Sequence, residues 1–391
     1  MLNVLYVFGG EKASGAEKVI ERLVVQNTAH VNAHLFISPG NFAQTLLDDP
    51  NSSFVKKTLV SRLKKLNRSG TGKLKFYLNA LLNYFSISWL VYRYVMKNKI
   101  DVVHANTIVP ASYLLPALWF SKVFNPQVKW FWSDHDLKYF SSLDHKLSAL
   151  CVKTFDLTLV VSEAVKTKYG SHTAKIEVLY NGLNISEFKS DAALRKAFRQ
   201  NHKINEQTVI IGLAGTIQPR KGQLALMNAF IKINKEFAES RLLLAGPPSA
   251  DEPVYVDDVL KAIKQNPSIK YMGKISDMVS FYNGCDIIVN NSSNEGGGGE
   301  SLGTTLYEAM ACKKIVAASA TGGSPEIIDN KINGYLFKPD SAEDVYQILR
   351  DIMVNINGLE KIKENARIKV HERFNILAMA ERYNLLLSNK K

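Results

Sequence analysis

The sequence predicts an α/β fold made of two domains, each built on a parallel β-sheet. At 391 residues the chain is longer than one ordinary hydrophobic core supports. Short apolar strands followed by glycine-bearing loops and helices recur along it, as in parallel sheets. This pattern stops in a polar stretch and restarts near residue 207. An apolar fraction of 46% with 22% charged residues is typical of a globular protein.

The first domain begins with an apolar strand over residues 2–8. The turn GGEKASGAE follows and leads into an amphipathic helix, a unit typical of Rossmann-like sheets. The G-x-G-x-x-G spacing is absent, so the turn is not the dinucleotide-binding fingerprint. Gly15 at the helix entrance would let a phosphate or sugar approach the backbone closely. A tight turn without a ligand is the alternative, since glycine serves turns generally.

The N-terminal segment, the apolar segments and the cysteines indicate the compartment of the protein. The segment LNVLYVF lacks a basic lead and a cleavage site, so we interpret it as a strand and not as a signal peptide. The apolar segments 77–95 and 108–120 are interrupted by polar residues or are too short to span a bilayer. The three cysteines have no partners at disulfide or zinc spacing, which favours a cytoplasmic location: Cys151, Cys285 and Cys312.

A basic segment over residues 55–75 accounts for much of the net charge of +13. It contains no acid, and its cations alternate with apolar residues: Lys56, Lys57, Arg62, Lys64, Lys65, Arg68, Lys73 and Lys75. Such segments lie on anionic membrane surfaces, where each cation contributes roughly 1 kcal/mol. A solvated loop and helix face is the alternative. A nucleic-acid partner is disfavoured because no recognition module is present.

An aromatic-rich helix over residues 74–97 precedes the buried strand IDVVHAN. We expect a crossover helix packed on the sheet, with its aromatic side chains in the core. A helix near 110–121 and the strand VKWFWSDHD follow. His135 stands between two aspartates just past this strand, where parallel sheets collect ligands, and we expect it to be functional. We expect His104 to be structural.

The first domain is predicted to close near residue 187. Two more buried strands, within FDLTLVVSEAV and IEVLYNGLN, complete residues 1–187. The polar segment 188–206 is interpreted as a linker. Residues 207–370 then form the second domain, and residues 371–391 a C-terminal helix that packs back across the junction.

The second domain opens with the segment TVIIGLAGTIQPRKGQ, a strand, a loop and the start of a helix. Arg220 and Lys221 lie in the loop, at the carboxyl end of the strand. Two adjacent cations in this position can neutralise a diphosphate without a metal. An ordinary surface pair is the alternative.

The stretch 285–318 organises the second domain. It predicts a buried strand, a glycine-rich loop, a helix from about Gly303 and a second buried strand. A loop that ends in a helix N-terminus offers free N–H groups and suits a phosphate. Glu300 and Glu308, seven residues apart, are better placed to accept hydrogen bonds from sugar or ribose hydroxyls. The combination indicates a sugar nucleotide as the ligand.

With these motifs in order, the chain resembles the GT-B glycosyltransferases of family 4, a retaining class also called group 1. The resemblance covers nearly the whole chain and rests on seven motifs: SGAEKV, SDHDL, VVSEAV, VLYNGLN, AGTIQPRKGQ, ESLGTTLYEAMACKKIVAA and GGSPEIIDNKINGYLFKP. It implies two Rossmann-like domains facing across a cleft, with the sugar nucleotide held mainly by the second.

The resemblance also implies roles for single residues. Glu300 would contact the donor sugar, and Glu308 would hold the ribose. Arg220 and Lys221 would bind the diphosphate and support catalysis. Backbone N–H groups near the helix start and one glycine of the first domain would add diphosphate contacts: Leu302, Gly303, Thr304 and Gly15. His135 would lie near the transferred sugar.

Two departures from the family pattern stand out. The family usually has arginine where this chain has Thr216, so Arg220 would carry more of the phosphate charge. Residues 294–299 form a glycine-rich insertion ahead of Glu300, and this insertion makes Glu295 a competing first glutamate. The seven-residue spacing to Glu308 favours Glu300.

The sequence thus predicts a retaining transferase that moves a hexosyl unit from a nucleoside-diphosphate sugar. A UDP-sugar is favoured over a GDP-sugar, and no metal or other cofactor is expected. The expected acceptor is a saccharide, lipid-linked at the inner membrane face, in bacterial-type surface polysaccharide or glycolipid synthesis. A GT-B sugar-nucleotide epimerase or phosphorylase, or a non-catalytic sugar-nucleotide-binding protein, are the alternatives.

Overall fold

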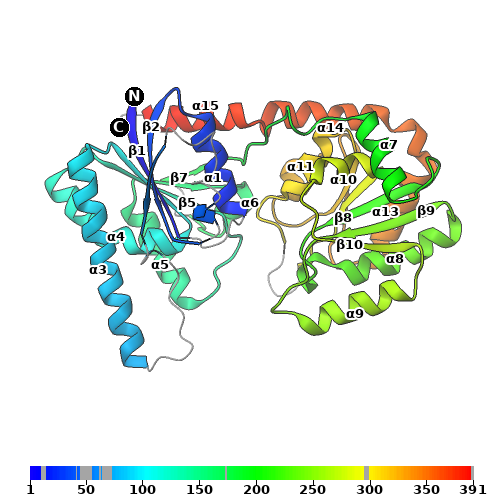
Figure 1. Cartoon of the computed structure of the whole chain (residues 1–391), viewed down its shortest axis with the longest axis horizontal. Helices are drawn as coiled ribbons and strands as arrows, with labels where there is room; N and C mark the ends of the chain where they lie inside the picture. The colour runs from blue at the N-terminus through cyan, green and yellow to red at the C-terminus, as the bar shows by residue number, and fades with distance from the viewer. Residues whose placement is uncertain are drawn as a thin grey trace. The chain divides into compact units, whose positions relative to one another are not determined.

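The computed structural model divides the chain into two compact units (Figure 1). It describes residues 1–9, 15–40, 42–44, 55–60, 63, 73–171, 174–294 and 299–388, with the backbone alone for residues 73–77. Unit 1 comprises Met1–Gly182 and Ile376–Lys391, and unit 2 comprises Leu183–Asn375. The chain therefore passes from one unit to the other twice.

Unit 1 is built on a seven-stranded sheet whose neighbouring strands pair in parallel. The strand order is β3-β2-β1-β4-β5-β6-β7. The strands are β1 (Leu2–Phe8), β2 (Val31–Ile37), β3 (Lys56–Leu59), β4 (Val102–Asn106), β5 (Lys129–Asp134), β6 (Leu157–Val160) and β7 (Ile176–Val178). The parallel sheet and the first strand over residues 2–8 are confirmed.

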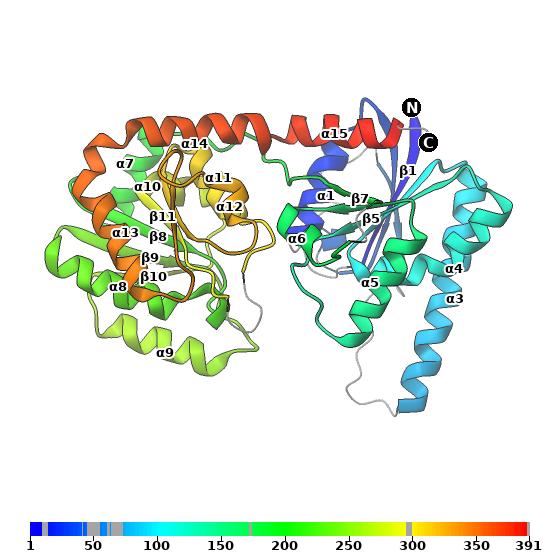
Figure 2. The same ribbon diagram turned by 180° about the vertical axis from the view of Figure 1, so that it is seen from behind.

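The described helices of unit 1 flank this sheet (Figures 1 and 2). They are α1 (Gly15–Gln26), α3 (Lys73–Asn98), α4 (Ile108–Phe124), α5 (Ser142–Thr154), α6 (Glu163–Thr167) and α15 (Ile376–Ser388). Helix α15 packs on α1 and adds Ile376, Met379 and Tyr383 to the core of unit 1.

His104 of β4 is a buried structural residue, as predicted. Its Nδ1 lies 2.8 Å from the hydroxyl of Tyr383 on α15, and its Nε2 lies 2.7 Å from that of Ser133 on β5. Burial lowers the pKa of His104 to about 3, so the imidazole is neutral near pH 7. The histidine therefore ties the last helix of the chain to the centre of the sheet.

Helix α3 differs from the prediction, because only one of its faces is buried. Ile87, Val91 and Val95 pack into unit 1, whereas Phe85 and Trp89 are 58% and 60% exposed. The expectation that the aromatic side chains of this helix belong to the core is wrong for these two. A helix that is apolar all round does not reveal which face has a partner.

The basic segment 55–75 contains an element that was not predicted. Lys56–Leu59 form β3, an edge strand that pairs with β2. Most of the remaining segment lies outside the described residues. Within the described parts of the chain, no helix is both long and apolar enough to cross a bilayer.

Unit 2 contains a six-stranded parallel sheet with the order β10-β9-β8-β11-β12-β13. Its strands are β8 (Val209–Ala214), β9 (Ser240–Ala245), β10 (Ile269–Gly273), β11 (Ile287–Asn290), β12 (Ile315–Ser319) and β13 (Tyr335–Phe337). Its helices are α7 (Ala192–Asn201), η2 (Pro219–Lys221), α8 (Gln223–Glu236), α9 (Pro253–Lys264), α10 (Met278–Gly284), α11 (Thr304–Ala311), α12 (Ser324–Ile327), α13 (Ala342–Asn355), η4 (Ile356–Gly358) and α14 (Glu360–Arg373). The strand, loop, helix and strand predicted over 285–318 are confirmed as β11, α11 and β12.

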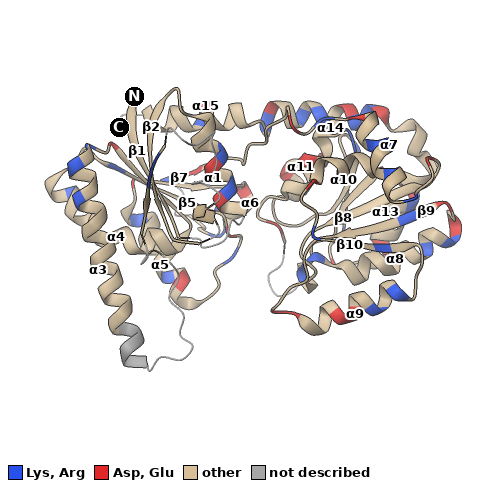
Figure 3. Ribbon diagram, viewed as in Figure 1, with Lys and Arg blue, Asp and Glu red and all other residues tan. Residues whose placement is uncertain are grey.

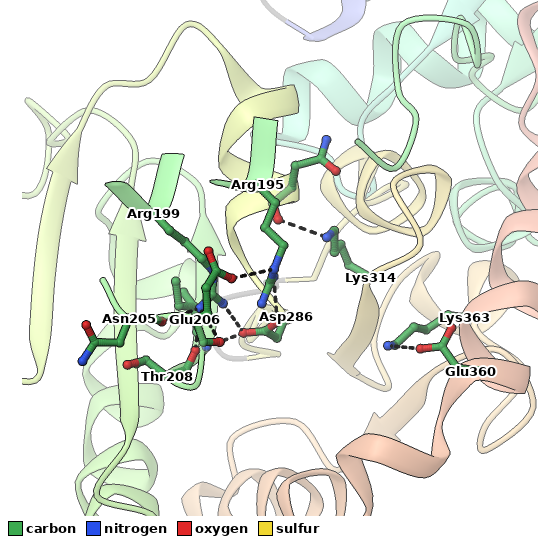
Figure 4. A network of polar contacts seen from close by, with 11 residues as sticks. Arg195, Arg199, Asn205, Glu206, Thr208, Asp286, Lys314, Glu360 and Lys363 are labelled. Atoms are coloured by element: carbon green, nitrogen blue, oxygen red, sulfur yellow. Dashed lines mark hydrogen bonds and ion pairs between the residues drawn. The ribbon is translucent and has the colours of Figure 1, made fainter. Parts of the chain in front are cut away.

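The segment 188–206, interpreted above as a linker, contains α7 and belongs to unit 2. A fully buried Arg199 fixes it there (Figure 4). The guanidinium donates to the carbonyls of Asn205 and Thr208 at 2.8 and 2.9 Å. It also lies 2.7 Å from Asp286, whose carboxylate accepts the N–H of Ile210 as well. This network joins α7 to the amino ends of β8 and β11.

Candidate functional site

Four polar side chains of unit 2 meet at the carboxyl ends of its strands. Arg220 and Lys221 lie in η2, which follows β8, and Ser292 follows β11. Glu300 lies in the loop between β11 and α11. We call these four residues the Glu300 cluster. In parallel sheets, ligands bind at this edge.

Glu300 is the centre of the cluster. Its Oε1 accepts hydrogen bonds from Lys221 Nζ, from Ser292 Oγ at 3.0 Å and from Arg220 Nη1 at 3.4 Å. No described residue bonds to Oε2. Burial alone would raise the pKa of Glu300, but the charges of Lys221 and Arg220 outweigh burial and lower it. Glu300 is therefore ionised, with one oxygen left as an acceptor.

Two glycines determine the backbone conformation of the loops that hold the Glu300 cluster. Gly222 has a φ of +61°, and a Cβ there would lie 2.3 Å from the carbonyl oxygen of Asn291. Gly322 has a φ of +54°, and its Cβ would lie 2.0 Å from the carbonyl oxygen of Glu300. That carbonyl accepts the N–H of Gly323 at 2.8 Å. The backbone of Glu300 is thus positioned by a turn that only glycine fits.

Helix α11 points its N-terminus at the same edge of the sheet. Leu302 and Gly303 precede the helix and Thr304 begins it. The first N–H groups of a helix lack intrahelical partners, and the helix dipole makes this end positive. With two cations of η2 nearby in the cluster, the arrangement suits an anion such as a diphosphate.

Glu308, the second glutamate, lies one turn further along α11. Its Oε2 accepts a hydrogen bond of 2.7 Å from the hydroxyl of Tyr282 on α10. Tyr282 is fully buried, and burial together with the Glu308 charge raises its pKa well above 10. Sequence reasoning missed Tyr282, because an isolated tyrosine in an apolar helix carries no motif.

His135 lies at the corresponding edge of the sheet in unit 1, directly after β5. With the amide of Asn106 oriented as in the structure, His135 Nε2 donates to Asn106 Oδ1 at 2.8 Å. Burial lowers the pKa of His135 to about 4; Asp134 opposes this shift and Lys168 adds to it. The imidazole is therefore neutral near pH 7, with Nδ1 as an acceptor.

Asp134, the residue before His135, forms a buried ion pair with Lys168. Lys168 Nζ lies 2.5 Å from Asp134 Oδ2, with side chains only 8% and 4% exposed. Tyr169 donates its hydroxyl to the same oxygen. Burial and the charge of Asp134 also raise the pKa of Asp136 to about 6. We call Asn106, Asp134, His135, Asp136 and Lys168 the His135 cluster. The sequence indicated the two aspartates beside His135, but not Asn106 or Lys168.

Gly15, Thr216 and Glu295 complete the residues singled out above. Gly15 is exposed at the start of α1, and a Cβ there would meet no described atom within 4 Å. The carbonyl of Thr216 accepts a hydrogen bond of 2.9 Å from Gln223. Glu295 lies outside the described residues, as does most of the insertion 294–299.

Comparison with protein families accounts for both units. A "Glycosyltransferase Family 4" model matches residues 14–187, and a "Glycosyl transferases group 1" model matches residues 195–369. Among solved structures, Anabaena HepE in complex with UDP-glucose aligns over 99% of this chain and 100% of its own, with a TM-score of 0.81 and 19% identity. This similarity shows a shared fold.

Two curated relatives are more similar in sequence. The lipopolysaccharide 1,2-N-acetylglucosaminetransferase of Salmonella typhimurium is 28% identical over 243 residues, which cover 59% of this chain and 61% of that protein. The capsular polysaccharide biosynthesis glycosyltransferase CapM of Staphylococcus aureus is 26% identical over 246 residues, covering 61% and 62%. The matches thus span about three fifths of each relative. With a family 4 domain followed by a group 1 domain, the chain belongs to the group 1 glycosyltransferases of the GT-B fold.

Proposed function

We propose that this protein transfers a hexosyl unit from a nucleoside-diphosphate sugar to a saccharide acceptor, with retention of anomeric configuration and without a metal. The observation that carries the proposal is the Glu300 cluster. It combines an ionised carboxylate with one oxygen that no described residue bonds, two cations and a helix N-terminus at one sheet edge. These groups match the hydroxyls and the diphosphate of a sugar nucleotide.

The proposed chemistry places most of the catalysis on the leaving group. As the glycosidic bond to the diphosphate breaks, negative charge grows on the departing oxygen. Lys221, Arg220 and the N-terminus of α11 would stabilise that charge. Lys221 first has to exchange its bond with Glu300 for one with the diphosphate. The acceptor hydroxyl attacks from the same face and passes its proton to the departing oxygen, so no carboxylate nucleophile is needed.

The donor is proposed to be a UDP-sugar, with a GDP-sugar as the second choice. The support is the HepE fold, since HepE has been crystallised with UDP and with UDP-glucose. Glu308 would hold the ribose, and Tyr282 would fix the Glu308 carboxylate for this contact. Gly15 and His135 in unit 1 remain predicted donor contacts; His135→Ala should lower kcat without changing the unfolding of the protein.

The acceptor is proposed to be lipid-linked at the inner face of a membrane, in surface polysaccharide or glycolipid synthesis. The names of the Salmonella and Staphylococcus relatives support this class of pathway. The basic segment 55–75 supports an anionic surface as a partner. A cytoplasmic, peripheral location follows from this proposal.

A panel of UDP-, GDP- and ADP-sugars tests the function, with thermal unfolding and donor hydrolysis as readouts. One nucleotide should stabilise the fold and be hydrolysed slowly, equally with and without EDTA. Product anomers analysed by NMR test retention. Stabilisation without turnover, even with membrane extract added, would favour a binding protein, whereas conversion of the donor to another sugar nucleotide would indicate an epimerase. No stabilisation by any donor would overturn the proposal.

A further inference from the structure

Helices α3 and α4 carry apolar side chains that unit 1 does not cover. On α3 the exposed residues recur every three to four positions, which places them on one stripe of the helix. They are Leu78, Leu81, Leu82, Phe85, Trp89 and Met96, each 46–62% exposed. The last turns of α4 add Trp119, Phe120, Val123 and Phe124, which are 50–72% exposed.

The two sets form one continuous surface. The helices pack against each other, and Tyr92 joins their exposed faces. The Tyr92 ring stacks on Trp89 with centroids 6.0 Å apart, and it lies 6.3 Å from the ring of Phe120 on α4. Near the C-terminal end of α3, the side-chain amide of Asn125, which directly follows α4, donates a hydrogen bond to Met96 Sδ. We call these residues the α3–α4 surface.

The charged residues of this region are almost all cations. Residues 50–133 contain thirteen lysines and arginines and a single acid, Asp101, which gives a net charge of +12 in a chain of +13. The ribbons of α3 and α4 in Figure 3 show blue and no red. The basic segment 55–75 leads directly into α3. Almost the whole net charge therefore lies in the same part of the sequence as the uncovered apolar stripe.

A groove beside the exposed apolar residues of α3 is lined in part by cations. It has a volume of about 700 Å³ and runs between β3 and α3, lined by Leu59, Trp89, Arg93 and Lys97 among others. Neither Arg93 nor Lys97 forms an ion pair with a described residue. A groove with apolar walls and two cations that have no ion-pair partner among the described residues fits an amphiphile with an anionic head.

We infer that the α3–α4 surface docks on an anionic lipid bilayer, with its Trp, Phe and Leu side chains at the level of the acyl boundary. Trp and Phe beside Lys and Arg, without acids, are typical of helices that lie in the membrane interface. A protein partner would need acidic groups opposite residues 50–133, whose net charge is +12. A second copy of this chain would instead bring like charge to this surface. The inference extends the proposed membrane-linked acceptor, but vesicle binding is measured without any acceptor.

Tryptophan fluorescence provides a direct test, because all four tryptophans lie in unit 1. Trp130 and Trp132 are fully buried, while Trp89 and Trp119 are 60% and 50% exposed. Vesicles of 70% phosphatidylcholine and 30% phosphatidylglycerol should shift the emission of the wild-type protein to the blue. The double variant Trp89→Phe/Trp119→Phe should still bind but show no shift. An unshifted wild-type spectrum at saturating vesicle concentration would overturn the inference.

Substitution of the stripe gives the matching affinity test. Leu82→Gln/Trp89→Gln should weaken vesicle binding at least about tenfold, since two apolar side chains lose their burial. The control Ile332→Gln/Val354→Gln removes two side chains of similar exposure, 58% and 61%, from unit 2 and should bind as wild type. Arg93→Gln/Lys97→Gln should weaken binding to anionic vesicles and flatten its salt dependence.

The outcomes separate this inference from the proposed function. A protein that is stabilised by a sugar nucleotide but ignores vesicles would refute the docking surface alone. Vesicle binding without any response to sugar nucleotides would refute the transferase function alone. Sedimentation without lipid tests whether a second copy of this chain occupies the surface instead. A wild-type dimer that Leu82→Gln/Trp89→Gln converts to a monomer would assign the surface to a second copy and overturn the inference.

Discussion

The Glu300 cluster and the His135 cluster occupy equivalent edges of two parallel sheets, yet their charges are opposite. In unit 2, Arg220 and Lys221 surround a single carboxylate beside a positive helix end. In unit 1, the single cation Lys168 lies among several acids, and burial together with nearby carboxylates raises the pKa of Asp136 to about 6. The Glu300 cluster has more cations than carboxylates, and the His135 cluster has more carboxylates than cations.

The two clusters also differ in how firmly their charges are held. The Lys168–Asp134 pair is buried on both sides and has two further hydrogen bonds, from Tyr169 and to the carbonyl of Asp136. Arg220 is 41% exposed, and Glu300 keeps one oxygen without a described partner. A permanent pair stabilises the fold, whereas an exchangeable pair can be opened by a ligand. The comparison predicts that removing the cation of the Lys168–Asp134 pair mainly changes stability, whereas removing the lysine of the Lys221–Glu300 pair mainly changes turnover.

Lys168→Met should produce the largest change in stability. It leaves the carboxylate of Asp134 buried without its cation, which typically costs about 3–5 kcal/mol. Urea unfolding followed by tryptophan fluorescence reports unit 1 selectively, because unit 2 has no tryptophan. The control Lys166→Met breaks a partly exposed pair with Glu163 and should cost under about 1 kcal/mol. An equal decrease in the free energy of unfolding of the two variants would show that the buried pair stabilises the fold no more than the exposed pair does.

Lys221→Ala should reduce kcat by about 100- to 1,000-fold, as expected for the loss of one group that stabilises the leaving group. The unfolding midpoint should change less than in Lys168→Met, because Glu300 keeps Arg220 and Ser292 as hydrogen-bond partners. Lys232→Ala, which removes an exposed lysine paired with Glu343 on the same unit, should leave kcat unchanged. A folded Lys221→Ala protein with full activity would remove Lys221 from the proposed mechanism.

Tyr282→Phe should act on donor binding and not on chemistry. Glu308 would lose the hydroxyl that orients its carboxylate, and a hydrogen bond to a charged group contributes about 1.5–3 kcal/mol. We expect the KM for the donor to rise about tenfold with little change in kcat. Tyr255→Phe removes another hydrogen-bonded hydroxyl of unit 2 and serves as the control. A fall in kcat at unchanged KM would contradict an orienting role.

Mild acid should destabilise unit 1 by a smaller amount. The pKa of His104 is about 3 in the folded protein, below the ordinary value of 6.5. As pH falls below 6.5 the unfolded chain gains a proton that the folded chain does not, so stability decreases towards pH 3. At pH 5.5 this should cost about 1 kcal/mol. The change should be smaller in His104→Gln, and an identical pH profile in both proteins would contradict the assignment.

The fold was predictable because strand, glycine turn and helix repeat with buried apolar strands between them. The Glu300 site was predictable for the same reason: a carboxylate pair at a fixed spacing and adjacent cations leave local patterns in the sequence. Partners such as Tyr282 and Lys168 leave none. Their roles depend on contacts across 26 and 34 positions of the chain, which only the fold brings together.

The errors in the interpretation have a common cause. Strand β3 was missed because its lysines fit a surface segment, although an edge strand tolerates charge. The polar composition of residues 188–206 predicts a linker, whereas Arg199 of helix α7 is fully buried and bonds to Asp286. The aromatic residues of α3 were assigned to the core because apolar character does not tell a protein partner from any other. In each case the sequence gives the chemistry of a side chain and the environment decides its use.

Unit 1 is discontinuous in the chain, and this has a consequence for biosynthesis. Its core includes Tyr383 and its neighbours on α15, nearly four hundred positions after β1. A ribosome therefore completes all of unit 2 before the last helix of unit 1 emerges. Until then, His104 lacks the Tyr383 hydroxyl and the surface of α1 that α15 covers stays open. The first half of the chain to be translated is the last to finish folding, and nascent chains stalled before residue 376 should be the ones that chaperones retain.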